Sequence, residues 1–218
     1  VPSTVGASAT TPDSRVLLVD RPGAAQSELR IGHAAPSRTT PDYHALVVLN
    51  AVIGGQFTSR INRRLREEKG ITYGAHTSFD FRRQAGSFSC DTSVQSDATA
   101  DAVCDVLQEF ASIRDVAVSP GELAAARASL TRGYVRNFET AGQISRAAVQ
   151  LATHGLPGDT FDRFVPLIEG IERDDVLKAA TTWIRPGDAT VVVVGAGESV
   201  GASLSKVGRT VETIAPEF

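Results

Sequence analysis

The stretch that decides the fold is Gly54-Gly-Gln-Phe-Thr-Ser-Arg-Ile-Asn-Arg-Arg-Leu-Arg-Glu-Glu-Lys-Gly-Ile-Thr-Tyr-Gly74. Its charged middle, residues 60 to about 69, predicts a short helix, and Gly70 is a residue type that commonly ends one. Residues 71–81 are rich in β-branched and aromatic side chains, so they predict a strand. The chain is therefore expected to fold back at Gly70 from a helix into a strand.

The segments before this stretch predict two strands and a helix. Residues 15–20 form a short apolar run that ends in Arg-Pro-Gly, and residues 27–33 alternate polar and apolar positions. A helix opens at Pro41 and continues to the glycine pair that begins at residue 54. Residues 1–14 are rich in Pro, Ser, Thr, Gly and Ala, which predicts a flexible lead-in or linker.

The segments after it predict a hairpin, a helical block and a last strand. Residues 82–86 read as a hairpin connection to a strand over 86–94, and a helical signal extends from 99 to 184. Within that block, Ser119-Pro-Gly-Glu122 has the spacing of a capping box. Further helices are expected over about 140–154, 160–169 and 173–184, followed by a buried strand over 190–195 and a weaker one over 210–214.

This order of elements predicts an α+β fold with two layers. Strands that come before and after runs of helices favour a mixed, mostly antiparallel sheet with helices packed on one face. The chain has 218 residues, of which 42% are hydrophobic, and this is enough for one well-packed core. Residues 15–218 are therefore expected to form a single domain.

Composition excludes several classes of function. The net charge is -3, so no strong basic field exists to hold a phosphate backbone, and nucleic-acid binding is not expected. No uninterrupted apolar run reaches the length of a membrane span. Two cysteines, Cys90 and Cys104, are too few for a disulfide scaffold, and whether they are bridged stays open. The chain contains no methionine, which leads us to expect a processed product or an excised domain.

Arg66 and Tyr73 are the candidate site residues. Arg66 lies near the predicted helix end and Tyr73 near the start of the next strand, so the turn at Gly70 would bring a guanidinium and a phenol toward one point. Both groups donate hydrogen bonds, which suits a carbonyl oxygen that gains negative charge in a tetrahedral transition state. A purely structural interpretation also fits, because an arginine near a helix C-terminus favours the dipole and a tyrosine in a strand is common.

The same stretch resembles the C-terminal, non-zinc half of the pitrilysin, insulinase and mitochondrial processing peptidase family. The resemblance rests on the glycine pair, on a Ser-Arg step followed by Ile61 where the family has Leu, and on L-R-E-x-x-G-x-x-Y over residues 65–73. Residues 21–33 and 190–195 resemble the opening and closing strands of that half, so the likeness covers about residues 15–200. It implies a processing-peptidase-like metallohydrolase fold, and it implies that Arg66 and Tyr73 contact substrate beside a zinc held by another domain.

The zinc motif of this family is absent from the chain. The family's catalytic half carries H-x-x-E-H on a helix, whereas His33, His44, His76 and His154 are far apart in this sequence and none has a histidine four residues away. We expect no metal or other cofactor in this chain, and zinc in the partner half. Glycines 195, 197 and 201 follow an apolar strand like a dinucleotide fingerprint, but too little chain follows them for the rest of that unit. They therefore predict a turn that leaves the last core strand.

Three hypotheses of function follow from these features. The first is a substrate-binding half of a zinc metalloendopeptidase, inactive alone, whose partners are an H-x-x-E-H catalytic domain, on the same or another polypeptide, and a peptide substrate that an exposed strand edge would bind. The second is a scaffold or core-type subunit without peptidase activity, and the third is a nucleotide-binding protein. A homo-oligomer is not excluded, and a bacterial periplasm or cytoplasm are both open as the location.

Overall fold

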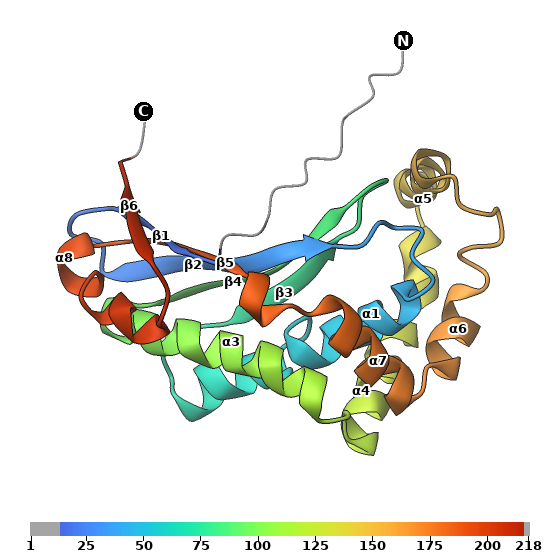
Figure 1. Ribbon diagram of the computed structural model, residues 1–218. Helices are drawn as coiled ribbons and strands as arrows, with labels where there is room; N and C mark the ends of the chain where they lie inside the picture. The colour runs from blue at the N-terminus through green and yellow to red at the C-terminus, as the bar shows by residue number, and fades with distance from the viewer. Residues whose placement is uncertain (1–13, 216–218) are drawn as a thin grey trace, which may run out of the picture.

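The centre of the molecule is a six-stranded sheet covered on one side by helices (Figure 1). This computed structural model describes residues 14–215, so residues 1–13 of the predicted lead-in 1–14 lie outside the described residues, as do 216–218. The strand order is β3-β4-β2-β5-β1-β6. The strands are β1 Val16–Asp20, β2 Gln26–Ala35, β3 Ala75–Asp80, β4 Gly86–Gln95, β5 Thr190–Gly195 and β6 Val211–Ile214.

The sheet is mixed and mostly antiparallel, as the sequence predicts. Strand β2 pairs antiparallel with both β4 and β5, and β3 pairs antiparallel with β4. Strand β1 pairs in parallel with β5 and β6. Burial alternates along β2, β4 and β5, because one face of the sheet meets the helices while the other does not.

Most of the helices form the second layer, under one face of the sheet (Figure 1). They are α1 Tyr43–Ile53, α2 Arg60–Asn62, α3 Thr99–Asp115, α4 Pro120–Thr131, α5 Ala141–His154, α6 Phe164–Gly170, α7 Arg173–Trp183 and α8 Gly197–Val200. Helix α2 continues directly into a π-helical segment, η1 Arg63–Glu68, and a 3-10 segment, η3 Tyr134–Phe138, precedes α5. In the described part of the chain, no helix is long and apolar enough to cross a membrane. The prediction of an α+β fold with helices on one face is confirmed.

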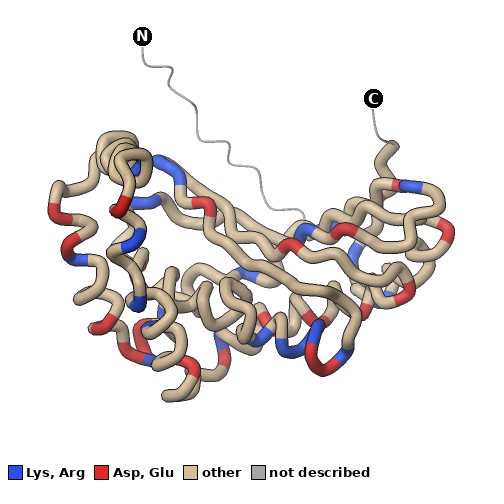
Figure 2. Tube along the Cα trace, turned by 180° about the vertical axis from the view of Figure 1, so that it is seen from behind, with Lys and Arg blue, Asp and Glu red and all other residues tan. Residues whose placement is uncertain are grey.

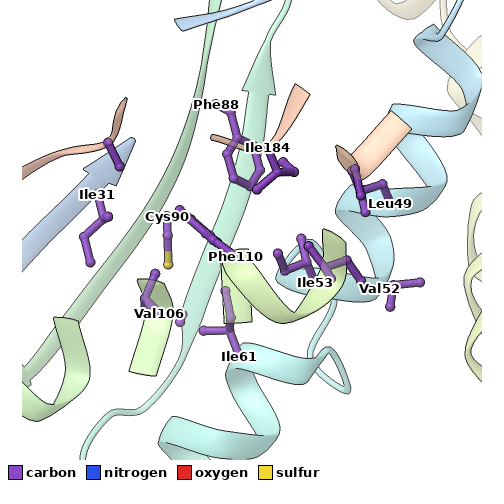
Figure 3. Close-up of a cluster of buried hydrophobic side chains, with 14 of the residues drawn as sticks. Ile31, Leu49, Val52, Ile53, Ile61, Phe88, Cys90, Val106, Phe110 and Ile184 are labelled. Atoms are coloured by element: carbon purple, nitrogen blue, oxygen red, sulfur yellow. The ribbon is translucent and has the colours of Figure 1, made fainter. Parts of the chain in front are cut away.

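The hydrophobic core lies between the two layers (Figure 3). Phe88 and Cys90 point down from β4 and meet Phe110 and Val106 of α3, while Ile53 joins them from α1. These side chains are fully or almost fully buried, and each large apolar side chain removed from water stabilises the fold by roughly 1.5–3 kcal/mol. Cys90 is thus an apolar core residue, and both cysteines are free thiols.

Two segments differ from the sequence-based expectation. Strand β3 begins at Ala75 instead of residue 71, because the intervening residues bond to the helix end and to β4 outside the strand ladder. Residues 197–200 form the short helix α8, where a plain turn is expected. The Gly197 N–H donates to Asp20 Oδ1 at 2.7 Å, so the first residue of α8 is bonded to a carboxylate of this chain.

Candidate functional site

The fold-back between helix and strand at Gly70 is present in the structure. Gly70 has φ +64°, a left-handed conformation that side-chain-bearing residues rarely adopt. The Ile71 N–H donates to the Leu65 carbonyl at 3.0 Å and closes the helix end. The chain then enters β3 at Ala75, so Arg66 and Tyr73 lie on the two arms of one tight turn.

The Arg66 side chain is held over the ring of Phe57. The guanidinium carbon lies 3.2 Å from the centroid of that ring, and Nη2 donates to Glu67 Oε1 at 2.7 Å. The Arg66 Nε is buried and has no hydrogen-bond partner among the described residues. Stacking on an aromatic face is favourable for a guanidinium and limits its rotamers. Arg66 is therefore a positioned cation whose Nη1 makes no hydrogen bond within the described residues.

The Tyr73 side chain projects into solvent while its backbone is fixed on both sides. Its exposed fraction is 93%, the highest of the exposed large hydrophobic side chains in the described chain. The Thr72 hydroxyl donates to the Ser93 carbonyl at 2.7 Å and lies 3.0 Å from Thr92 Oγ1. The Thr92 hydroxyl in turn donates to the Gly74 carbonyl at 3.0 Å. A phenol that projects from an anchored loop without packing against its own fold is available to a ligand.

The structure brings Arg66 and Tyr73 to the same turn but not into contact. In the part of the chain that the structure describes, no hydrogen bond or ring contact joins the two side chains. Any joint action of Arg66 and Tyr73 therefore requires a third group between them.

Acidic and basic residues are interspersed along the trace, including around this turn (Figure 2).

Asn62 joins the three segments that carry the candidate residues. This side chain is 3% exposed, in the helix that leads to Arg66. Its amide nitrogen donates to the Gln56 carbonyl at 3.0 Å, to Ser59 Oγ at 3.2 Å and to the Ala75 carbonyl at 2.7 Å, and its oxygen accepts from the Ala75 N–H at 2.8 Å. One buried amide thus ties the loop of Phe57 to the start of β3, two residues after Tyr73.

The free edge of β3 is partly occupied by its own chain. The backbone N–H and carbonyl of Ala75 are bonded to Asn62, and the Thr77 N–H donates to the Gly54 carbonyl at 3.1 Å. The Thr77 hydroxyl also donates to Asn50 Oδ1 at 2.9 Å. Gly54 has to be glycine here, because an added Cβ would collide with the Thr77 side chain. The half of β3 nearest to Tyr73 therefore cannot add a peptide strand without breaking these bonds.

A depression on the open face of the sheet lies beside the turn instead. Its volume is about 560 Å³, and Gly74 lines it, the residue next to Tyr73. The floor combines apolar Val192 and Val194 of β5 with polar side chains of β2 and β4, among them Arg30 and Asp91, which pair with each other. This surface offers both apolar contact and hydrogen-bonding groups next to the exposed phenol.

Arg60, the arginine of the Ser-Arg step, has a structural partner. Its guanidinium forms a bidentate pair with Glu122, with Nε–Oε1 at 2.6 Å and Nη2–Oε2 at 3.0 Å. Glu122 also completes the predicted capping box of α4, since its carboxylate accepts from the Ser119 N–H at 2.8 Å and its own N–H donates to the Ser119 hydroxyl at 3.2 Å. The motif thus anchors the start of α4 through Arg60.

Protonation of Glu122 at low pH should lower the stability of the fold. The hydrogen bond from Arg60 lowers the pKa of Glu122 to about 2, so this carboxylate stabilises the folded state fully above its ordinary pKa and loses that effect as pH falls from about 4.5 to about 2. Glu122→Gln should cost on the order of 2 kcal/mol at pH 6 and nothing near pH 2, as measured by urea unfolding. Glu169→Gln, at an exposed position of α6, is the control. A cost that stays constant with pH would show that the ion pair is not responsible.

The described residues do not fit a zinc site. No group of three or more His, Cys, Asp or Glu side chains in residues 14–215 could hold a metal ion. His33 is buried, its Nδ1 lies 2.9 Å from the Ala34 carbonyl, and its Nε2 accepts from the Arg185 N–H at 3.1 Å.

Trp183 packs partly against the core and donates from Nε1 to Asp42 Oδ2 at 2.7 Å.

Sequence reasoning missed two residues of the site. Phe57 lies between the two helices that the sequence predicts, and its contact with Arg66 across nine positions leaves no periodic signal. Asn62 is recognisable in retrospect, because it is a polar residue in the same turn as buried Ile61 and Leu65. A polar residue on the buried side of a helix indicates a bonded partner, since burial without one is costly.

Comparison with known proteins identifies relatives of this arrangement. A family model described as the peptidase M16 inactive domain matches residues 2–130. An uncharacterized zinc protease of Mycobacterium tuberculosis is 30% identical over 128 residues, which are 57% of this chain and 28% of the relative. The chain thus matches less than a third of the length of such mycobacterial relatives.

Two solved structures share the fold. The peptidase M16 inactive domain from Pseudomonas fluorescens has a TM-score of 0.79 and 20% identity, over 85% of this chain and 44% of that chain. A chain of complex III2 from Candida albicans has a TM-score of 0.73 and 14% identity, over 91% of this chain and 50% of that chain. Since the family model covers more than half of the sequence, the resemblance expected from residues 54–74 is confirmed, and this chain belongs to the peptidase M16 inactive-domain family.

Proposed function

We propose that this chain is the substrate-binding half of a zinc metalloendopeptidase, and that Arg66 and Tyr73 complete an active site whose zinc is held by a partner half. The observation that carries the proposal is the turn around Gly70. There the Arg66 guanidinium is held over Phe57 and the Tyr73 phenol projects into solvent, both from hydrogen-bonded backbone. Neither side chain is needed to hold the other in place. The zinc proteases among its relatives suggest the reaction class.

The proposed role of the pair is to bind a carbonyl oxygen of the peptide. The gap between Arg66 and Tyr73 is to be filled by substrate, with the phenol and the guanidinium donating to the oxygen as it gains charge. Both groups are hydrogen-bond donors, and the guanidinium also brings a positive charge to the developing oxyanion. The H-x-x-E-H half would bind the zinc and activate water, which the described residues of this chain cannot do.

The peptide is proposed to lie across the open face of the sheet, next to Tyr73. The depression lined by Gly74, Val192 and Val194 gives it room, whereas the near half of the β3 edge is bonded to Asn62 and Gly54. On this face the peptide would meet side chains of β2, β4 and β5, both apolar and polar. This arrangement replaces strand addition at an exposed sheet edge, the binding mode that the fold analogy predicts.

Reconstitution tests the proposal. The 218-residue chain incubated with zinc and then desalted should keep no stoichiometric metal. Mixed with an H-x-x-E-H half and zinc, it should give cleavage of an unfolded peptide that neither half gives alone. The matched control is a catalytic half whose motif glutamate is replaced, which should give none. Tight zinc in this chain alone, or equal cleavage without it, would overturn the assignment.

A second function is favoured by one comparison. The likeness to a chain of complex III2 covers 91% of this sequence, so the same fold also serves in an assembly. A scaffold subunit would bind its partner without raising cleavage. The reconstitution therefore separates the two functions by activity at saturating complex formation.

A further inference from the structure

A second concave site is lined partly by α5. Figure 1 shows α5 at one end of the sheet, close to the β3–β4 hairpin. The volume of this site is about 400 Å³, and its walls come from α5, from η3, from the start of α1 and from the loops before α1 and α6. The ring of Tyr43 connects it to the hairpin, 4.9 Å from the ring of Phe81. This pocket shares none of its lining residues with the Gly70 turn.

The pocket is cationic. Its charged lining residues are Arg38 and Arg146, and no carboxylate lines it. Arg38 lies 3.4 Å over the centroid of the Tyr43 ring, and neither arginine takes part in an ion pair within residues 14–215. Some other arginines of the described chain, such as Arg60 and Arg64, are instead paired with carboxylates. Two unpaired guanidinium groups facing one cavity favour an anion.

The uncharged polar groups of the pocket can also donate to an anion. Tyr43 and Tyr134 line it together with three side-chain amides, those of Asn137, Gln143 and Gln150. Burial raises the pKa of Tyr134 to about 12 and also raises that of Tyr43, so both phenols stay protonated donors at neutral pH. Phenols and amides orient an anion without adding a competing negative charge.

The remaining walls are aromatic. Tyr134 stacks on Phe164 with ring centroids 4.4 Å apart, and Phe138 lies 5.4 Å from Phe161. Tyr134, Phe138 and Phe161 also line an adjoining, mainly apolar pocket of about 490 Å³, which is lined in addition by Val135, 74% exposed, and by one carboxylate, Asp162. A ligand with only a charge would leave these rings unused, so the lining favours a charge attached to an apolar body.

We propose that this pocket binds a carboxylate that carries an aromatic or other apolar group, with Arg38 and Arg146 neutralising the charge and the Tyr134 and Phe138 rings contacting the apolar part. A small metabolite and the C-terminal residue of a peptide both present this chemistry. Binding at this pocket does not need the zinc half, so its test is independent of the proposed peptidase role.

Calorimetric titration of the 218-residue chain tests the proposal. N-acetyl-phenylalanine should bind about tenfold more tightly than N-acetyl-phenylalaninamide, because charge-assisted hydrogen bonds are lost with the charge. Inorganic phosphate should bind more weakly than the aromatic acid. Ala-Ala-Phe and its C-terminal amide form the second arm: stronger binding of this peptide acid than of N-acetyl-phenylalanine identifies a peptide end, and the reverse identifies a small metabolite.

Variants decide whether binding occurs at this pocket. Arg38→Gln and Arg146→Gln should each weaken the acid about tenfold and leave the amide unchanged. Arg146 is exposed, so its replacement keeps the fold intact even if that of Arg38 does not. Arg136→Gln, the same charge change in η3 outside the pocket, should have no effect. Equal affinity for acid and amide, phosphate binding as tight as the aromatic acid, or an equal loss in the Arg136 control would overturn the proposal.

Discussion

Arg66→Gln should slow peptide cleavage by the reconstituted enzyme by about 100- to 1000-fold in kcat. Loss of one transition-state hydrogen-bond donor typically costs on the order of 2.7–4 kcal/mol, and the loss falls on kcat because the bond strengthens only as the carbonyl oxygen gains charge. Arg66→Lys keeps the positive charge but loses the planar fork that lies on Phe57, so an intermediate loss is expected. Steady-state kinetics at saturating peptide measures both.

Tyr73→Phe gives the complementary measurement. This change removes the hydroxyl alone, and the 93% exposure of Tyr73 means that the stability of the chain should not change. A fall in kcat of similar size, with unchanged urea unfolding, would separate a role in catalysis from a role in folding.

Arg63→Gln is the matched control for Arg66. It lies in the same π-helical segment, is exposed, and has no side-chain partner among residues 14–215. It should leave both kcat and KM within about twofold of the unaltered chain. If Arg63→Gln and Arg66→Gln were equally harmful, the effect would reflect the general charge of the helix. If Arg66→Gln and Tyr73→Phe both turned over normally, the pair would be structural.

Local signals in the sequence sufficed for much of the fold. Gly70 predicts the end of the helix because its left-handed conformation is a property of one residue, and Ser119 with Glu122 predicts the start of α4 from a three-residue spacing. The alternation over residues 27–33 likewise reports which side of β2 is buried. In each case the physical cause acts within a few residues, so the printed sequence contains it.

Contacts between distant segments were beyond this reasoning. Strand β3 begins at Ala75 and not at the predicted residue 71, because Ile71 and Thr72 bond to the helix end and to β4. No pattern within residues 71–81 reveals these bonds. The contact of Arg66 with Phe57 and the pocket around Arg38 depend on how loops meet in three dimensions. Arg66 and Tyr73 are candidates because of their spacing around Gly70 and, mainly, because of the family resemblance; the structure adds how the turn holds them.

Asn62→Ala should be the most destabilising single truncation at this site. It leaves the N–H and carbonyl of Ala75 and the carbonyl of Gln56 without their buried partner, and each unpaired buried group costs about 1–3 kcal/mol. We expect a total loss of about 3 kcal/mol in the free energy of unfolding, measured in urea. Asn137→Ala, at an exposed position of η3, should change it by less than about 0.5 kcal/mol.

Asn62→Asp sharpens this test, because it keeps the shape of the side chain. It replaces the donating nitrogen by an oxygen that would face three acceptors, Gln56 O, Ser59 Oγ and Ala75 O, so it should destabilise the chain at least as much as alanine at pH 7. Hydrogen exchange should quicken first at the Ala75 and Thr77 amides, which are bonded to Asn62 and Gly54. Slow exchange of both amides in the Asp variant would mean that the loops around Arg66 and Tyr73 are held by other contacts, and that Asn62 does not position them.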